Sequence, residues 1–371
     1  MHTLLSDLLA KPPALPPAIT GHEKIVLYGA GNLGVLALDF LAHLGITPLA
    51  VLDRNAPLST QPSGDIPVMR PEGYPAEADV TVLVTIGTMA YAPIAESLRT
   101  AGWANVLPFY DYAEHFRDRH PLNNGWFSGS LTDEDRTHIA SLPDMWADDG
   151  SRRAYLQFLA WRYAREEWVF PEAPIDASNR FFIPEISCHL HADEVFIDAG
   201  AYDGRVLQRF LDHTGGMRAA HVFEADVANY AQLAHAVAAL PDSMRLRVHL
   251  HAQALSNRNG KISFSGGFGM ASRADAQALT RVQATCLDAL ALAPTFMKLH
   301  LEGGELAALE GSLITLTAHR PMLAITVYHT RDGLWKTADW LRHHLPRYRF
   351  YFRLHAWCGT GAVIYAVPEE R

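Results

Sequence analysis

The stretch Val195-Phe-Ile-Asp-Ala-Gly-Ala-Tyr-Asp-Gly204 joins an apolar run to an acidic, glycine-containing turn. A short amphipathic helix is predicted to follow at residues 205–212. In open α/β sheets, ligands bind in the crevice at the carboxyl ends of the parallel strands, where each strand is followed by its helix. Glycines let backbone approach a ligand closely. The stretch therefore predicts a strand, a turn and a ligand site, with the carboxylate of Asp198 beside Gly200 and Gly204.

A second short strand, residues 220–223, ends on an acid. Glu224 follows Asp198 by 26 residues, which is room for one strand-helix-strand step. A carboxylate at the tip of the second strand can bind both ribose hydroxyls of a nucleotide. The functional interpretation is a site for a nucleotide-type cofactor. The alternative is an ordinary crossover with a turn aspartate and a solvated glutamate.

Length and composition restrict the class of protein. A chain of 371 residues is long for one core and suggests two or three domains. The net charge of −9, without a basic tract, gives no reason to expect nucleic acid or an anionic membrane as partner. Cys188, Cys286 and Cys358 are odd in number and widely spaced, which argues against a disulfide framework or a cysteine zinc site and fits a reducing cytoplasm.

The first twenty residues form a proline-rich lead-in. Prolines at 12, 13, 16 and 17 cannot lie inside a helix, so a domain boundary is expected near Thr20. The leucines at 4, 5, 8 and 9 are interrupted by polar residues and follow no basic region, so no signal peptide is expected. No apolar run reaches the roughly 18 residues of a membrane span. We therefore expect a soluble, cytoplasmic protein.

Residues 21–115 read as a small Rossmann-like domain. Gly29, Gly31 and Gly34 form a G-x-G-x-x-G turn between a predicted strand and helix, and Asp53 follows 19 residues after the last glycine. Three roles remain open: binding NAD, binding a nucleotide-sugar or similar phosphate ligand, or packing without a ligand. The predicted strands are 24–28, 48–52, 80–86 and 105–109, with helices from the glycine turn to 44 and at 92–101.

Residues 116–190 are predicted to be a helical connector between two α/β domains, with Ser151 as an N-cap. Residues 191–371 form the second α/β domain, with further strands at 246–250, 296–301 and 322–328 and an antiparallel pair at 348–354 and 362–367. Residues 261–264 and 282–286 suggest a hairpin around a glycine-rich loop at 265–272. A surface loop is favoured there over a lid on a site.

Five ordered blocks in the C-terminal half resemble one family. They are Phe196-Ile-Asp-Ala-Gly-Ala-Tyr-Asp-Gly204, Phe223-Glu-Ala225, Ala254-Leu-Ser256, Leu287-Asp288 and Lys298-Leu-His-Leu-Glu-Gly-Gly-Glu305. In order and spacing, over residues 154–368, they are similar to the FkbM-type S-adenosylmethionine-dependent methyltransferases. The resemblance implies a class I methyltransferase sheet, mostly parallel with an antiparallel C-terminal hairpin. It also implies methyl transfer from S-adenosylmethionine to a hydroxyl. The cofactor-binding residues that it implies are Asp198, Gly200, Tyr202, Gly204, Glu224, Ala225, Gln253 and Ala254.

The fourth block departs from the family pattern. The usual motif, Lys-x-Asp-x-Glu-Gly, has an aspartate where this chain has His300. A neutral imidazole there could act as a general base near pH 7, or could only form hydrogen bonds within the crevice. His329 is expected at the end of the neighbouring strand, and Glu302 lies two residues beyond His300. These three are the candidate catalytic residues. They could also bind a divalent metal, although a metal-free pair is the favoured interpretation.

The predicted architecture is thus α/β: a methyltransferase domain, a smaller N-terminal Rossmann-like domain and a helical connector. The predicted activity is O-methylation of a saccharide or other small metabolite, in a chain that could form a homo-oligomer. Two competing hypotheses rest on the N-terminal glycine turn: an NAD-dependent oxidoreductase, or a nucleotide-sugar binding module that delivers a substrate.

Overall fold

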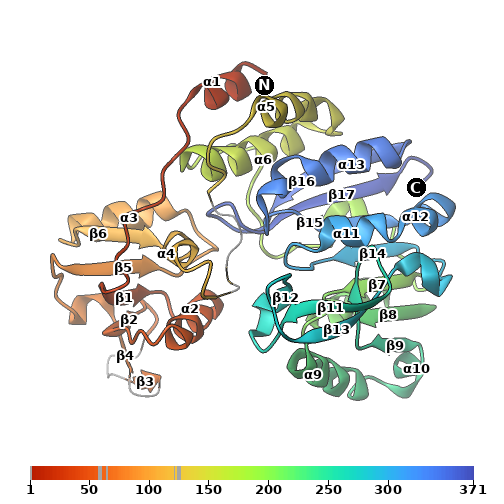
Figure 1. Ribbon diagram of the computed structural model, residues 1–371, viewed down its shortest axis with the longest axis horizontal. Coiled ribbons are helices and arrows are strands. Elements are labelled where there is room, and N and C mark those ends of the chain that lie inside the picture. The colour runs from red at the N-terminus through yellow and green to blue at the C-terminus, as the bar shows by residue number, and fades with distance from the viewer. Residues whose placement is uncertain (1, 57–60, 64–65, 121, 123–126) are drawn as a thin grey trace.

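The computed structural model describes residues 2–56, 61–63, 66–120, 122 and 127–371. A smaller α/β domain at the N-terminal side lies beside a larger α/β domain (Figure 1). Each is built on its own sheet, and a third, small sheet belongs to the larger domain. No helix among the described residues is long and apolar enough to cross a bilayer.

Seven strands form the large sheet in the order β16-β17-β15-β14-β7-β8-β9. Strand β17 is antiparallel to both neighbours, and the other pairs are parallel. This confirms the predicted mostly parallel sheet with its antiparallel C-terminal pair. The strands are β7 (Val195–Ala199), β8 (Ala219–Phe223), β9 (Val248–His251), β14 (Phe296–Leu299), β15 (Met322–Thr326), β16 (Tyr348–Leu354) and β17 (Ala362–Pro368).

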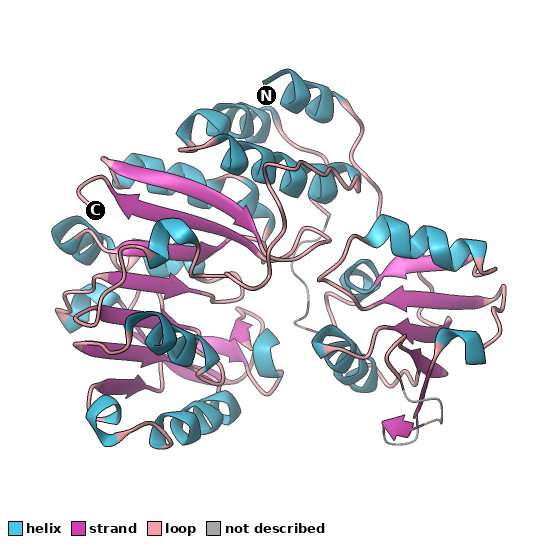
Figure 2. Ribbon diagram, turned by 180° about the vertical axis from the view of Figure 1, so that it is seen from behind, coloured by secondary structure: helices cyan, strands magenta, loops and turns pink. Residues whose placement is uncertain are grey.

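Helices cover both faces of this sheet (Figure 2). Successive strand residues point to opposite faces, so Phe196 packs on one side and Ile197 on the other. The Phe196 side carries α7 (Pro184–Ser187), α8 (Arg205–Thr214) and α9 (Val227–Ala238). The Ile197 side carries α6 (Asp149–Leu159), α11 (Glu305–Glu310), α12 (Leu313–His319) and α13 (Lys336–His344). Because the central strands are covered on both faces, nearly all of their residues are apolar, and this explains the near-continuous apolar runs in the sequence.

The N-terminal sheet has the order β3-β4-β2-β1-β5-β6, parallel except for β3. Helices α2 and α4 cover one face and α3 the other. The short strands β3 and β4 were not predicted. The elements are β1 (Lys24–Tyr28), α2 (Asn32–His43), β2 (Ala50–Leu52), β3 (Gln61–Ser63), β4 (Ile66–Met69), β5 (Val80–Val84), α3 (Tyr91–Thr100), β6 (Asn105–Pro108) and α4 (Phe109–His115).

The start of the chain contains a helix that the proline pattern did not predict. Helix α1 (His2–Ala10) lies beside α5 (Asp133–Ser141), away from the N-terminal sheet (Figure 1). Its buried leucines, Leu5, Leu8 and Leu9, join the core of the larger domain. The Lys11 ammonium binds the Glu166 carboxylate at 2.6 Å. The lead-in therefore docks on the larger domain before the chain enters the smaller one.

The predicted N-cap of α6 is wrong by three residues. Asp148 is the N-cap, and its carboxylate accepts the N–H of Ser151 at 2.6 Å. The Ser151 hydroxyl instead accepts the N–H of Phe352 in β16 at 3.0 Å, so this serine ties α6 to the sheet. Helix α6 runs into a π-turn at Ala160–Ala164 and packs on β16.

Two further element predictions need correction. Leu246 lies at the end of α10 (Asp242–Arg245) and is exposed, so the third strand begins only at Val248. The leucines at 306, 309, 313 and 316 have a spacing that predicts one helix, but the structure has two, α11 and α12, which are separated at Gly311. There the Ser256 carbonyl approaches so closely that a Cβ on Gly311 would lie 2.0 Å from its oxygen. The short 3₁₀ turns are Pro71–Gly73, Leu142–Met145, Gly269–Ala271, Leu287–Leu290 and Arg331–Leu334.

The third sheet consists of β10 (Ala254–Leu255), β13 (Arg281–Thr285), β11 (Gly260–Ser265) and β12 (Arg273–Ala274), in that order. Strands β11 and β13 are antiparallel, as the predicted hairpin requires. The additional strand β12 returns along β11, so the glycine-rich loop between them folds back toward the large sheet.

Candidate active site

The glycine turn after β7 is shaped by contact with the next strand of the sheet. Gly200 has a φ of +72°, and a Cβ there would lie 1.9 Å from the carbonyl oxygen of His300. Gly204 has a φ of +85° and forms the N-cap of α8. Tyr202, between them, also has a positive φ, of 56°. The turn is therefore held open and close to the end of β14, as a backbone cradle for a ligand requires.

Asp198 lies beneath this turn and outside the lining of the cavity above it. Its carboxylate binds the Lys298 ammonium at 2.9 Å, and both side chains are almost fully buried. The same ammonium donates to the carbonyl of Gly200 at 2.7 Å. The second carboxylate oxygen of Asp198 has no hydrogen-bond partner among the described residues. The geometry gives Asp198 and Lys298 the task of supporting the turn from below.

Glu224 stands at the tip of β8 and lines the cavity. Its two carboxylate oxygens accept the backbone N–H groups of Tyr202 and Asp226, each at 2.9 Å. Burial raises the pKa of Glu224 in spite of these bonds. Each oxygen retains a further lone pair, so the carboxylate can bind a ligand while it holds the two turns in place.

A cavity of about 940 Å³, here called the crevice pocket, opens above the glycine turn. That volume is within the usual range for small-molecule sites. The structure brings six of the eight predicted cofactor residues to its wall. Asp198 and Gly204, the N-cap of α8, are the exceptions. The six are Gly200, Tyr202, Glu224, Ala225, Gln253 and Ala254.

The loop at residues 265–272 corrects the prediction of a plain surface loop. Gly269, Met270 and Ser272 line the crevice pocket. One oxygen of Asp226, the N-cap of α9, accepts the N–H of Gly267 at 2.6 Å and the hydroxyl of Ser272 at 2.8 Å. The loop is thus a pinned wall of the cavity. The sequence signal for this contact is Asp226 itself, because an N-cap aspartate uses one carboxylate oxygen for the helix and leaves the other able to accept further hydrogen bonds.

His300, Glu302 and His329 come together where β14 and β15 end. One carboxylate oxygen of Glu302 lies 3.1 Å from Nε2 of His300 and 3.2 Å from Nε2 of His329. The two imidazole rings are stacked, with their centroids 5.0 Å apart. One possible ligand atom from each of the three side chains lies within 4.8 Å of the other two. The predicted meeting of the two histidines with Glu302 is therefore present in the structure.

Glu305, in the first turn of α11, holds His329 and the turn after β14 in place. It accepts His329 Nδ1 at 2.8 Å, the hydroxyl of Thr326 at 2.7 Å and the N–H groups of Leu301 and Gly303, both at 2.9 Å. Burial opposes a charge on His329, but the carboxylates of Glu302 and Glu305 outweigh it and raise the pKa of His329 well above its ordinary value.

The other two members of the cluster shift in the opposite direction. Burial lowers the pKa of His300 to about 3. Burial also opposes ionisation of Glu302, but His329 and His300 outweigh it and lower the pKa of Glu302. Without a further ligand, His329 is therefore positively charged between the carboxylates of Glu302 and Glu305, and His300 is neutral.

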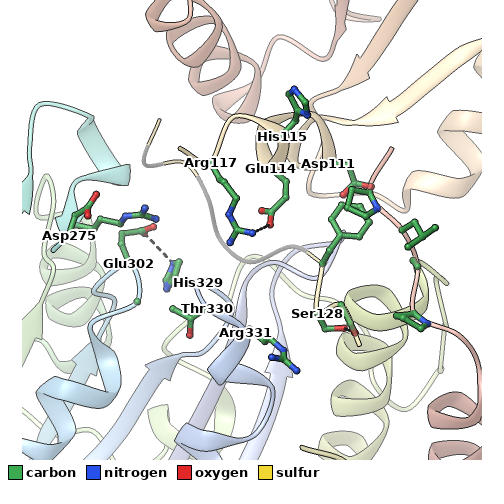
Figure 3. A pocket seen from close by; sticks show the side chains of 18 of the residues that line it. Asp111, Glu114, His115, Arg117, Ser128, Asp275, Glu302, His329, Thr330 and Arg331 are labelled. Atoms are coloured by element: carbon green, nitrogen blue, oxygen red, sulfur yellow. Dashed lines mark hydrogen bonds and ion pairs between the residues drawn. The ribbon is translucent and has the colours of Figure 1, made fainter. Parts of the chain in front are cut away.

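A second cavity, here called the interdomain pocket, has a volume of about 900 Å³ and lies between the two domains (Figure 3). Helix α4 of the N-terminal domain supplies Asp111, Glu114 and His115, and the larger domain supplies Glu302 and His329. The two pockets share the residues at 273–276 and at 302–304. They therefore meet at the His300, Glu302 and His329 cluster.

Several lining residues were missed by sequence reasoning. Arg180 lines the crevice pocket and donates to the Tyr328 hydroxyl at 2.9 Å. Arg273 and Asp275 line both pockets. Arg180 precedes the sheet and has no motif around it, so only the folded chain places it beside β15. Arg273 and Asp275 lie in the glycine-rich loop region, whose approach to the site was not predicted.

The N-terminal glycine turn has a compact local geometry. A Cβ on Gly34 would lie 2.2 Å from the carbonyl oxygen of Gly29, so helix α2 and the turn touch. One Asp53 oxygen accepts the N–H of Ala30 at 2.7 Å and the other that of Asn55 at 2.8 Å. Gly31 has open space around it. The structure of the turn itself accounts for Gly29, which has a φ of +118°, for Gly34 and for Asp53, whereas no contact in the turn requires a glycine at position 31.

The sheet order and the crevice above its central strands define a Rossmann-like methyltransferase fold, and comparison with known proteins agrees. Residues 198–352 match the model of the methyltransferase FkbM domain family. No curated protein matches the chain. The resemblance found in the sequence blocks is therefore confirmed.

A solved structure shows the same fold. A crystal structure of methyltransferase FkbM from Methylobacillus flagellatus KT matches with a TM-score of 0.66 and 19% identity, over 98% of this chain and 93% of the other. At this identity the likeness establishes the fold, including the N-terminal domain. An rRNA methylase from Streptococcus thermophilus matches at a TM-score of 0.33 and 14% identity, over 49% of this chain and 90% of the other.

Proposed function

We propose that the protein transfers a methyl group from S-adenosylmethionine to a hydroxyl of a small polyhydroxylated acceptor such as a saccharide. The observation that carries this proposal is the meeting of two pockets at one polar cluster. The crevice pocket contains the family's cofactor motif, and the interdomain pocket opens from the other side of Glu302. Two substrates that enter from the two sides would meet at His300, Glu302 and His329.

The crevice pocket has groups that fit the cofactor. The Glu224 carboxylate suits the two ribose hydroxyls, and the open backbone at Gly200 suits close approach of the methionine part. S-Adenosylmethionine supplies a methyl group on a positively charged sulfur, which leaves as a neutral thioether. The protein has to align the acceptor oxygen with that methyl group and to remove the hydroxyl proton.

The acceptor class follows from the lining of the interdomain pocket. Carboxylates, arginines and hydroxyls from both domains line it, among them Asp111, Ser128, Asp275, Thr330 and Arg331 (Figure 3). Apolar side chains such as Leu15 and Phe127 lie between these donors and acceptors, and such a mixed wall suits a molecule with several hydroxyls on a carbon framework. The cluster at its inner end handles the proton that the acceptor loses.

Calorimetry with S-adenosylhomocysteine tests the cofactor. We expect wild type to bind it and Glu224→Ala to bind about tenfold more weakly or worse, because a hydrogen bond to a charged group contributes about 1.5–3 kcal/mol. Glu96→Ala, on the exposed side of α3, is the control. Absence of binding by wild type, or equal binding by Glu224→Ala, would refute the proposed site.

A further inference from the structure

In the His300, Glu302 and His329 cluster, one possible ligand atom of each side chain lies within 4.8 Å of the other two. Because Arg180 donates to the Tyr328 hydroxyl at 2.9 Å, the hydroxyl proton is free to point to Nε2 of His300, 3.3 Å away. In the tautomer that carries its proton on Nδ1, the lone pair of His300 is on Nε2. The same nitrogen lies 3.1 Å from the Glu302 carboxylate, which is also an acceptor.

His329 can present a lone pair as well, once an ion replaces the proton on its Nε2. Its Nδ1 lies 2.8 Å from Glu305, whose oxygens are fixed by the backbone and by Thr326, so a neutral His329 carries its proton on Nδ1. Its Nε2 is buried, with the residue 3% exposed, and makes no hydrogen bond with any described residue, although Glu302 is 3.2 Å away. A carboxylate behind a histidine is the usual way to orient a metal-binding imidazole.

We propose that His300, Glu302 and His329 bind a divalent transition-metal ion at the junction of the two pockets. Two imidazoles and one carboxylate with open positions are a recognised donor set for such ions, whereas magnesium and calcium prefer oxygen ligands alone. Ligand atoms about 2.1 Å from one ion, at angles between octahedral and tetrahedral, lie about 3.0–3.4 Å apart. The two contacts of Glu302, at 3.1 and 3.2 Å, fall in that range.

The position of the ion gives it a role in the proposed methyl transfer. Glu302 and His329 line the interdomain pocket, so an ion held by them would be accessible to a ligand in that pocket. An acceptor hydroxyl bound there would lose its proton to water more easily, since a metal ion lowers the pKa of a bound oxygen. The oxygen then forms the new bond to carbon as the carbon–sulfur bond breaks. This role rests on the proposed function, but binding of the ion does not.

Cobalt binding to the full chain tests the site without any measurement of activity. After treatment with a chelator and its removal, we expect wild type to bind one Co²⁺ per chain and to show visible d–d absorption. Glu302→Gln and His300→Ala should each lower the affinity about tenfold or more. Thermal unfolding of each variant confirms that it is folded.

His221→Ala is the matched control. Nδ1 of His221 in β8 lies 3.2 Å from Nε2 of His251 in β9, and such a histidine pair could bind cobalt adventitiously. The control should bind like wild type. Undiminished binding by folded Glu302→Gln, loss of binding in His221→Ala, or no cobalt bound by wild type would each overturn the proposal. Calorimetry with S-adenosylhomocysteine is a separate measurement, so failure of the cofactor proposal is distinguishable.

Discussion

Gly200 combines a left-handed φ of +72° with a carbonyl oxygen, that of His300, where a side chain would begin. The contact exists because β7 and β14 are neighbours, with Asp198 opposite Lys298 in the register. The buried ion pair of the latter two side chains supports the same turn. Prediction from the sequence assigned Asp198 to the ligand, whereas the structure assigns it to Lys298. The pairing joins residues 100 positions apart, so no local pattern reveals it.

Gly200→Ala tests this contact. A Cβ 1.9 Å from the His300 oxygen forces β7 and β14 apart, and we expect a loss of unfolding free energy of about 3 kcal/mol or more. Gly45→Ala is the control, because it has a similar φ of +74° but nothing within 4 Å. Gly45→Ala should lower the unfolding free energy only by the strain of a left-handed alanine, about 1–2 kcal/mol. Denaturant unfolding measures both, and equal losses would contradict the argument.

At the scale of elements, the loop at 266–272 depends on one carboxylate. Asp226 caps α9 through Oδ1, which accepts the N–H groups of Ala228 and Asn229. Its Oδ2 holds the loop through Gly267 and Ser272. The loop therefore follows the end of β8, where Glu224 also stands. A hairpin between β11 and β13 was predictable from the strand pattern, but its fold over the crevice was not, since it depends on this distant acceptor.

Asp226→Ala should release the loop as well as remove the cap. We expect faster proteolytic cleavage within residues 266–272 and weaker binding of S-adenosylhomocysteine, because the loop is a wall of the crevice pocket. Thr132→Ala removes only a cap, that of α5, and should cost about 1 kcal/mol without either effect. If both variants are cleaved at the loop at the same rate, the pinning role of Asp226 is wrong.

On the scale of the whole molecule, the two domains are joined by specific contacts. Glu167 of the larger domain accepts the N–H groups of Tyr91 and Ala92 at the start of α3, at 2.6 and 2.7 Å. The N–H of Trp357 donates to the carbonyl of Gly87 at 2.8 Å, and Arg165 forms an ion pair with Asp111 at 3.2 Å. These contacts fix α4 beside the methyltransferase site, so the N-terminal domain can contribute directly to the interdomain pocket.

The glycine-rich loop reaches the N-terminal domain as well. Phe268 packs against His43 and His120, with ring centroids 5.3 and 5.0 Å apart. Burial, followed by the nearby His43, lowers the pKa of His120 to about 4, and Asp39 and Arg273 are the other charged groups that act on it. Protonation of His120 thus opposes the contact between the domains.

We expect acid to destabilise the protein through His120. Between pH 6.5 and about 4 the unfolded chain binds a proton at this histidine and the native chain does not, so the stabilisation is present above pH 6.5 and is lost as pH falls. Each unit of pKa difference corresponds to about 1.4 kcal/mol. In His120→Gln the dependence of unfolding free energy on pH should be weaker over this range. His22→Gln, at an exposed site, should leave the wild-type slope; the same slope in His120→Gln would contradict the prediction.

The sequence by itself determined the fold class, the two Rossmann-like units and the residues around the crevice, because strand periodicity, glycine turns and strand-end acids are local patterns. It also indicated that His300, Glu302 and His329 would meet, since neighbouring strands end at the same edge of a sheet. Only the tertiary structure decided that Glu305 orients His329, that the glycine-rich loop forms a wall, and that α4 closes a second pocket. Those arrangements depend on contacts between distant segments, and such contacts leave no periodic trace in the chain.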